Sequence, residues 1–165
     1  MTRRNLIAIF VAIIFALAAR AAGAANAVDS KVHYSPEAKK IVALVDQAAK
    51  LLEEKGKDAY AEFRKDKKWV NGTTYVFVLG FDGVLYVNPP SPEIEGTNRL
   101  DQKDSKGKFV PRDFIATAKS KGSGWVDYYW PKPGEKRPSK KISYVKKAKL
   151  ASGEDVVVGA GIYAD

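Results

Sequence analysis

The sequence predicts an α+β fold in which one long helix packs against an antiparallel sheet of five strands. An amphipathic helical stretch begins near Ser35, and five segments rich in aromatic and β-branched residues follow it, separated by turns that contain Pro or Gly. The densest strand pattern lies between Gly124 and Tyr163 and predicts three neighbouring strands. Strands that follow one another through short turns pair as antiparallel hairpins. The sheet is therefore expected to be antiparallel.

The long helix is predicted to begin after Ser35 and to end at Gly56. Ser35 is typical of an N-cap, Pro36 of the first helical position, and Gly56 of the residue that terminates a helix. Apolar side chains recur between them at helical spacing, at Ile41, Leu44, Val45, Ala48, Leu51 and Leu52. This stripe needs a sheet face to cover it. A second, short helical segment is expected over residues 59–64.

The first two strands are expected at residues 75–79 and 84–87, joined by a turn at Asp82-Gly83. Pro89-Pro90 ends the second strand, because proline cannot donate a hydrogen bond to a neighbouring strand. Residues 91–109 are polar and contain glycine, which predicts a long loop, and long loops in compact domains are more often functional than inert.

A second helix is predicted to open at Pro111 and to run to about Lys119. Together with the preceding loop it forms an insertion between the second and third strands. We expect this insertion to cover the sheet face that the long helix leaves open. The space enclosed there is where a small ligand would fit.

The strand at residues 124–130 carries aromatic side chains on both faces. Side chains alternate along a strand, so Trp125 and Tyr129 point one way, and Val126, Tyr128 and Trp130 point the other. One aromatic face can belong to the core. The other needs a cover of its own, which could be a helix, a partner or a ligand. The last two strands are expected at residues 141–148 and 155–163.

Residues 1–27 are predicted to be a cleavable signal peptide. Arg3 and Arg4 form a positive start, an apolar run extends over residues 6–17, and Ala25-Asn26-Ala27 is typical of a cleavage site. The run is shorter than the ~20 residues that a membrane-spanning helix needs, and an uncleaved anchor is the alternative. The paired arginines are compatible with twin-arginine export, but the general secretion route is favoured, because such pairs are common in signal peptides.

Cleavage would leave a single domain, residues 28–165, in the periplasm or outside the cell and without a stable membrane span. Its net charge would fall from +9 to +6, because three arginines and no acidic residue lie in the leader. Cysteine is absent and His33 is the single histidine, which argues against disulfides, zinc-thiolate sites and cysteine nucleophiles. We therefore expect no catalytic residues, no metal site and no cofactor. Export also argues against a nucleic-acid partner, although lysines and aromatics are interleaved.

Several motifs together resemble a known family. They are Glu53-Glu54-Lys55-Gly56, Tyr75-Val76-Phe77-Val78, Asp82-Gly83, Asn88-Pro89, Glu95-Gly96-Thr97-Asn98, Asp104 with Gly107, the segment from Gly124 to Pro131, Lys141, Ser143-Tyr144-Val145 and Val158-Gly159-Ala160-Gly161-Ile162-Tyr163. With these the chain is similar to a single Cache domain of the second single-Cache type, an extracytoplasmic sensory module of chemoreceptors and sensor kinases, in its stand-alone exported form. The resemblance covers about residues 36–163.

The resemblance implies a PAS-like sandwich with strand order 2-1-5-4-3 and the long helix on one face. It also implies that the other face binds a small molecule, such as a short organic acid. Two departures stand out. Asn88 occupies a position where the family often has histidine, and the transmembrane flanks and output domain of the receptors are missing from this sequence. The domain would therefore need a membrane receptor or kinase as its partner to pass on a signal.

A buried carboxylate needs charge-assisted hydrogen bonds and an apolar floor. The candidate ligand-binding residues are Tyr86, Asn88, Arg112, Tyr128, Trp130, Lys141 and Tyr144. Lys141 is the cation that the resemblance implies. Each candidate has a structural alternative, because aromatic side chains often belong to a core and strand or helix cations are often solvated. Residue alternation alone does not decide which sheet face meets the ligand.

The first functional hypothesis is therefore a non-enzymatic, exported binding module for a small organic acid. The alternative is a structural or interaction protein of the envelope, with a collapsed pocket and a basic surface that docks on a partner. An enzyme ranks last, because no catalytic set is present.

Overall fold

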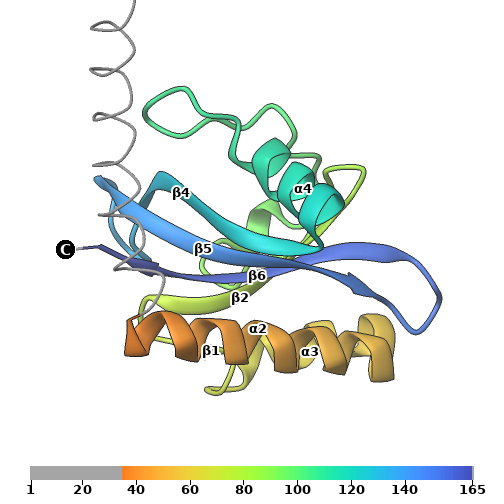
Figure 1. The fold of residues 1–165 in the computed structure, drawn as a ribbon. Coiled ribbons are helices and arrows are strands. Elements are labelled where there is room, and N and C mark those ends of the chain that lie inside the picture. Colours follow the sequence, from red (N-terminus) through yellow and green to blue (C-terminus); the bar gives the residue numbers. More distant parts are fainter. Residues whose placement is uncertain (1–34, 165) are drawn as a thin grey trace, which may run out of the picture. The chain divides into compact units, whose positions relative to one another are not determined.

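The computed structural model describes residues 35–164, and the predicted signal peptide lies outside them. Apart from the first residues of α2, the fold lies within the compact unit that begins at Lys39. Its elements are α2 (Pro36–Lys55), η1 (Gly56–Asp58), α3 (Ala59–Lys65), β1 (Val70–Asn71), β2 (Thr74–Gly80), β3 (Leu85–Val87), η2 (Pro92–Ile94), α4 (Val110–Lys121), β4 (Ser123–Pro131), β5 (Pro138–Lys149) and β6 (Asp155–Tyr163) (Figure 1). Within residues 35–164, no helix combines the length and hydropathy needed to cross a bilayer.

The strands form one antiparallel sheet in the order β1-β2-β6-β5-β4, and β3 also pairs with β2. The five strands predicted from the sequence therefore lie in the order 2-1-5-4-3, as expected. The sequence did not predict β1, a two-residue strand that turns back onto β2 through Gly72, whose φ is +58°. Two residues are too few to show the alternation that identifies a strand.

Helix α2 covers one face of the sheet (Figure 1). The N-cap prediction is confirmed, because the Ser35 hydroxyl oxygen accepts a hydrogen bond from the Ala38 amide at 3.0 Å. Gly56 follows the last helical residue with a φ of +59°. The apolar stripe of α2 joins strand residues in a core cluster that includes Ile41, Val45, Leu52, Val76, Val78, Val156, Val158 and Ala160.

Helix α4 covers the opposite face, as the insertion was expected to do (Figure 1). Its side chains Val110, Phe114, Ile115 and Ala118 share a second core cluster with Tyr75, Phe77, Leu79, Val126, Tyr128, Val145 and Val157. The Phe114 ring stacks on Phe77 at 5.1 Å and meets Tyr128 edge-on at 5.4 Å. Aromatic side chains from α4, β2 and β4 thus hold the helix on the sheet.

Glycine on the α4-facing side of β6 makes room for the aromatic layer. A Cβ at Gly159 would lie 2.4 Å from Cζ of Phe77, whose ring is already packed on Phe114. We expect Gly159→Ala to lower the free energy of unfolding by about 1–3 kcal/mol through overpacking, measured by urea denaturation. Adding Phe77→Leu should recover part of that loss; strictly additive effects would contradict this contact.

Candidate ligand-binding site

An inner cavity of about 50 Å³ lies between the sheet and its α4-side cover. It has room for several water-sized groups. Its lining is mostly apolar and comprises Tyr75, Phe77, Leu79, Leu85, Asn88, Ile94, Arg99, Gln102, Val110, Pro111, Phe114, Tyr128 and Trp130. An outer recess of about 470 Å³ shares Tyr75, Asn88, Ile94, Arg99, Gln102 and Trp130 with the inner cavity. The inner cavity therefore has a polar side that borders a larger recess.

Strand alternation determines which side chains reach the cavity. Tyr75, Phe77 and Leu79 occupy every second position of β2, and Tyr128 and Trp130 do the same on β4. The partner of Tyr128 across the β4–β5 ladder is Lys141, so these two side chains share one face.

Lys141 is the most unusual residue of the site. Its side chain is fully buried, and its Nζ atom has no hydrogen-bond partner among the residues that the structure describes. The Nζ atom lies 3.9 Å from the ring centroid of Tyr75 and 4.8 Å from that of Tyr163, so two aromatic rings hold it. Burial lowers the pKa of Lys141 to about 7, because desolvation disfavours the ammonium form.

Gly161 of β6 leaves the space that Lys141 occupies. A Cβ at this position would lie 2.3 Å from the Ser143 Oγ atom and 3.0 Å from the Lys141 Cε atom. Any larger residue would therefore push into the lysine stem or the neighbouring hydroxyl. The glycine explains how a fully buried lysine fits between tightly paired strands.

Three tyrosines lie beside the lysine: its Nζ atom contacts the rings of Tyr75 and Tyr163, and Tyr128 is its partner across the β4–β5 ladder. Tyr128 Oη and Ser143 Oγ are 2.9 Å apart, and the pair keeps one further O–H to donate. Tyr163 donates to the Pro131 carbonyl at 2.6 Å, and its hydroxyl is also hydrogen-bonded to that of Tyr75. Burial raises the pKa values of Tyr75 and Tyr128, and it raises the pKa of Tyr163 to about 12. All three phenols are therefore protonated at neutral pH.

The loop before α4 contributes a second cation. Arg99 Nε donates to Gln102 Oε1 at 2.9 Å, and both side chains line the inner cavity and the outer recess. Asn88, at the end of β3, lines the same boundary. The backbone N–H of Asn88 donates to Glu95 Oε1 at 2.6 Å, which fixes this position against the loop.

The structure brings four of the seven candidate residues together. Asn88, Tyr128 and Trp130 line the inner cavity, and Lys141 contacts the ring of Tyr75 in its wall.

Two tyrosine candidates lie on the α2 side of the sheet instead. Tyr144 alternates with Lys141 and Ser143 and therefore points away from the cavity; its hydroxyl donates to Ser123 Oγ at 2.7 Å. Tyr86 stacks on Tyr60 at 5.8 Å and donates to Glu154 at 3.0 Å. Neither residue lines the inner cavity.

Arg112 also lies outside the lining of the cavity. Its guanidinium binds the Leu100 carbonyl and the Asp101 carboxylate, and half of its side chain is exposed. The inward positions of α4 belong to Phe114 and Ile115, two and three residues later. The arginine that lines the cavity is Arg99.

Sequence reasoning missed Tyr75, Arg99 and Gln102. Alternation from Phe77 could have found Tyr75 once the ligand-facing side of the sheet was known. Arg99 and Gln102 lie in an irregular loop, where no periodicity places a side chain. Within residues 35–164, no group of three His, Cys, Asp or Glu side chains could hold a metal ion.

The model of one family, dCache_2, described as a Cache domain, matches residues 31–165. The methyl-accepting chemotaxis protein McpP of Pseudomonas putida is 28% identical to this chain over 91 residues. That match covers 55% of this chain and 16% of McpP, so this chain corresponds to a small part of that protein.

Solved structures agree with the family match. The periplasmic sensor domain of a chemotaxis protein is 33% identical, with a TM-score of 0.63 over 78% of this chain and 94% of its own. A structure described as the basis for carboxylic acid recognition by a Cache chemosensory domain is 29% identical, with a TM-score of 0.68 over 82% and 98%. A methyl-accepting chemotaxis protein of Vibrio parahaemolyticus, 23% identical, has the same fold, with a TM-score of 0.65 over 84% and 96%.

Cache sensor domains are non-enzymatic ligand-binding domains, which confirms the expectation that this chain is not an enzyme. The resemblance deduced from the motifs is likewise confirmed. The α+β fold, the cavity opposite the long helix and the family match agree, and the chain belongs to the Cache domain family.

Proposed function

We propose that this chain is an exported sensory domain that captures a short monocarboxylic acid in its inner cavity. The observation that carries the proposal is Lys141, a fully buried lysine without a hydrogen-bond partner, against the wall of a cavity. A buried cation without a counterion is costly, and a ligand carboxylate would supply the missing charge. The Cache structure described as recognising a carboxylic acid supports the same ligand class.

The two ends of the ligand need different surroundings, one polar and one apolar, and the site offers both kinds. The carboxylate needs a cation and hydroxyl donors, which Lys141 and the Tyr128–Ser143 pair would provide. The acyl tail needs an apolar floor, and Phe77 and Phe114 line the cavity. A second carboxylate on the tail would have to be desolvated against these rings. Short monocarboxylates are therefore favoured over dicarboxylates.

The expected setting is the periplasm, with a membrane receptor or kinase as the signalling partner. Residues 1–27 have the pattern of a signal peptide, and one of the similar structures is a periplasmic sensor domain. Ligand capture by this domain would then act on signalling through that partner.

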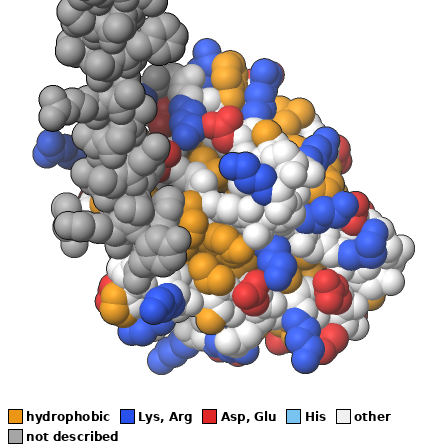
Figure 2. Space-filling model, in the orientation of Figure 1, with side chains coloured by type: hydrophobic (Ala, Val, Ile, Leu, Met, Phe, Trp, Pro, Cys, Tyr) orange, Lys and Arg blue, Asp and Glu red, His pale blue; other side chains and the backbone are white. Residues whose placement is uncertain are grey.

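The alternative is an interaction protein whose pocket stays empty. The small volume of the inner cavity, about 50 Å³, is the observation that favours it. On the face shown in Figure 2, Lys and Arg side chains are scattered, with acidic side chains among them. That face therefore offers no single basic field for an anionic partner. A ligand screen separates the two functions.

The first prediction concerns that screen. Residues 28–165 are heated with acetate, propionate, lactate or pyruvate, with succinate as the dicarboxylate comparison. A ligand present at 100 times its Kd stabilises the folded state by about 2.7 kcal/mol, which raises Tm measurably. We expect a rise with at least one monocarboxylate and a smaller one with succinate. A flat screen supports the interaction protein instead.

The second prediction concerns the pH dependence of binding. The free site has a lysine pKa of about 7, and the bound carboxylate stabilises the ammonium form, so binding takes up a proton above that pH. The affinity for the acid, measured by calorimetry, is expected to fall about tenfold per pH unit above about pH 7 and to level off below it. An affinity that does not change from pH 6 to pH 9 would show that Lys141 does not bind the acid.

The third prediction concerns the stability of the ligand-free domain. The folded pKa of Lys141, about 7, lies below the ordinary lysine pKa of 10.5, so the unfolded chain binds one more proton between these pH values. The Lys141 contribution to the free energy of unfolding therefore becomes more favourable as pH rises from about 7 to about 10. We expect Lys141→Met to remove this dependence, to raise stability at pH 7 by a few kcal/mol, and to abolish acid binding.

The control for this variant is Lys140→Met, on the opposite face of β5. Lys140 is only half-buried and precedes Lys141 directly. The Lys140→Met variant should leave acid binding and the pH dependence of stability unchanged. Urea denaturation at pH 7 and pH 9.5 measures both variants. A Lys141→Met protein less stable than wild type at pH 7 would refute the argument that this lysine is destabilising.

A further inference from the structure

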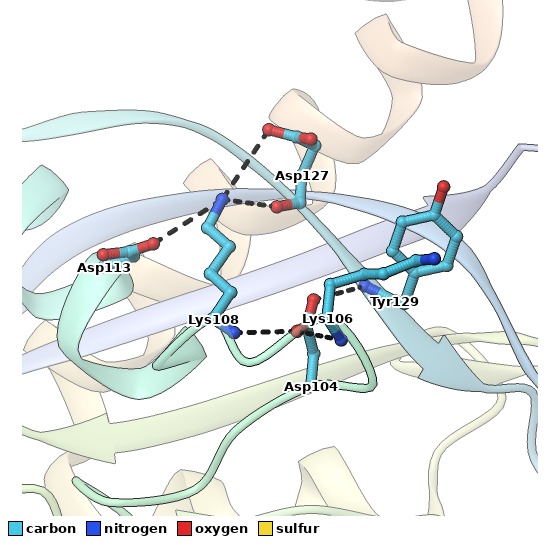
Figure 3. Close-up of polar contacts among 6 residues, drawn as sticks. All are labelled: Asp104, Lys106, Lys108, Asp113, Asp127 and Tyr129. Atoms are coloured by element: carbon cyan, nitrogen blue, oxygen red, sulfur yellow. Dashed lines mark hydrogen bonds and ion pairs between the residues drawn. The ribbon is translucent and has the colours of Figure 1, made fainter.

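The β4 strand has an open edge that side chains of the preceding loop cover. Among the strands of residues 35–164, β4 pairs only with β5, so its other edge has backbone groups without a strand partner in this part of the chain. Lys108 Nζ donates to the Asp127 carbonyl at 2.6 Å, and the Tyr129 amide donates to Asp104 Oδ2 at 3.0 Å. Figure 3 shows both bonds. Two side chains thus take the place of a neighbouring strand.

Asp104 also organises its own loop. Its Oδ1 atom accepts the amides of Lys106 at 2.8 Å and Lys108 at 2.9 Å, and its own amide donates to the Lys108 carbonyl at 2.9 Å. Only 9% of the residue is exposed. Burial alone would raise the pKa of Asp104, but the amides of Tyr129, Lys108 and Lys106 outweigh it and hold that pKa below its usual value. The carboxylate is therefore ionised at neutral pH.

Lys108 joins three parts of the structure. Besides the Asp127 carbonyl, its Nζ atom lies 3.5 Å from Asp113 Oδ2 on α4 and 3.7 Å from Asp127 Oδ1 on β4 (Figure 3). The Lys106 Nζ atom lies 5.3 Å from the ring centroid of Tyr129, which adds a second contact between loop and strand. The loop is thus held to the strand and to the helix at once.

We propose that Asp104 and Lys108, here called the edge clamp, are positioning residues. They hold the loop of residues 98–108, here called the roof of the cavity, in place and so set how fast a ligand leaves. The proposal rests on the proposed function. Arg99 and Gln102 line the inner cavity from the segment just before Asp104, and Trp130 lines it from the position after Tyr129. The Asp104 carboxylate therefore connects two walls of the cavity. Neither clamp residue lines the inner cavity itself.

The physical reason is preorganisation. A roof that is already fixed costs little conformational entropy when a ligand binds. A roof released from β4 would open more often, and ligand release would become faster. Differences in affinity among variants of one site lie mostly in koff. The edge clamp should therefore affect koff and leave kon nearly unchanged.

Asp104→Asn tests this bond selectively. The asparagine oxygen can still accept the amides of Lys106 and Lys108, so the local turn is kept. Its NH₂ group would face the Tyr129 N–H, and two donors cannot bond. Lys108→Met tests the other half of the clamp, because methionine keeps an unbranched apolar stem and loses the ammonium.

Asp66→Asn is the matched control. The Asp66 Oδ1 atom also accepts a backbone amide two residues ahead, from Lys68 at 2.8 Å, in an exposed turn between α3 and β1. This variant makes the same change of charge and keeps the same kind of local bond, at a turn that makes no bond to β4.

The experiment uses residues 28–165 with propionate as the probe. Stopped-flow kinetics should show koff raised about tenfold in Asp104→Asn and in Lys108→Met, with kon within about threefold of wild type and Asp66→Asn unchanged. Hydrogen exchange without ligand should quicken at Tyr129 and in residues 98–108 alone. The pH midpoint of propionate affinity should stay near 7, because Lys141 is untouched.

Three outcomes overturn the proposal. If koff and the hydrogen-exchange rates of Asp104→Asn equal those of the wild type, the clamp does not hold the roof. Faster exchange throughout the sheet would show that Asp104 is a general stability residue. Wild-type protein that binds none of acetate, propionate, lactate and pyruvate would overturn the clamp's role together with the monocarboxylate function. Normal wild-type binding with unaffected variants overturns the clamp alone.

Discussion

The buried ammonium group of Lys141 is the constraint on which the rest of the site depends. The group is fully buried, and its contacts are the faces of Tyr75 and Tyr163. Aromatic faces attract a cation, but they replace only part of its lost hydration. The pKa of Lys141 is therefore near 7, so that a carboxylate bound beside it would shift the lysine to its charged form at neutral pH. Strongly perturbed ionisable groups of this kind cluster at functional sites. Gly161 is the structural condition for this arrangement, because its missing side chain gives the lysine stem its space.

The two faces of the sheet are packed differently. The α2 face is covered by a regular helix and is filled by aliphatic side chains such as Val76, Val78 and Val158. The other face carries larger aromatic side chains, and its cover combines α4 with an irregular loop. Large rigid rings and an irregular cover pack less completely than aliphatic side chains under a helix, and the cavity lies there. The proposed ligand site thus lies on the face where the packing is interrupted.

The irregular loop is held by polar contacts rather than by regular secondary structure. At one end the Glu95 carboxylate accepts the Asn88 amide and pairs with Arg64 of α3 at 2.6 Å. At the other end Asp104 accepts three backbone amides. Buried carboxylates bonded to several amides are strong local anchors, because leaving any of these donors unpaired is costly. The loop therefore has a defined anchor near each of its ends.

The sequence by itself determined most of the elements and the family. Helical spacing, cap residues and strand alternation identified both long helices and five strands, because these signals are local and depend on residues a few positions apart. The motifs identified the Cache resemblance and the cation Lys141. Only the tertiary structure decided which sheet face meets the cavity: Tyr75 lines it, whereas Tyr86 and Tyr144 pack on the α2 side. It also placed Arg99, and not Arg112, in the lining of the cavity. Loop residues are placed by contacts with distant strands, and such contacts leave no periodic pattern in the chain.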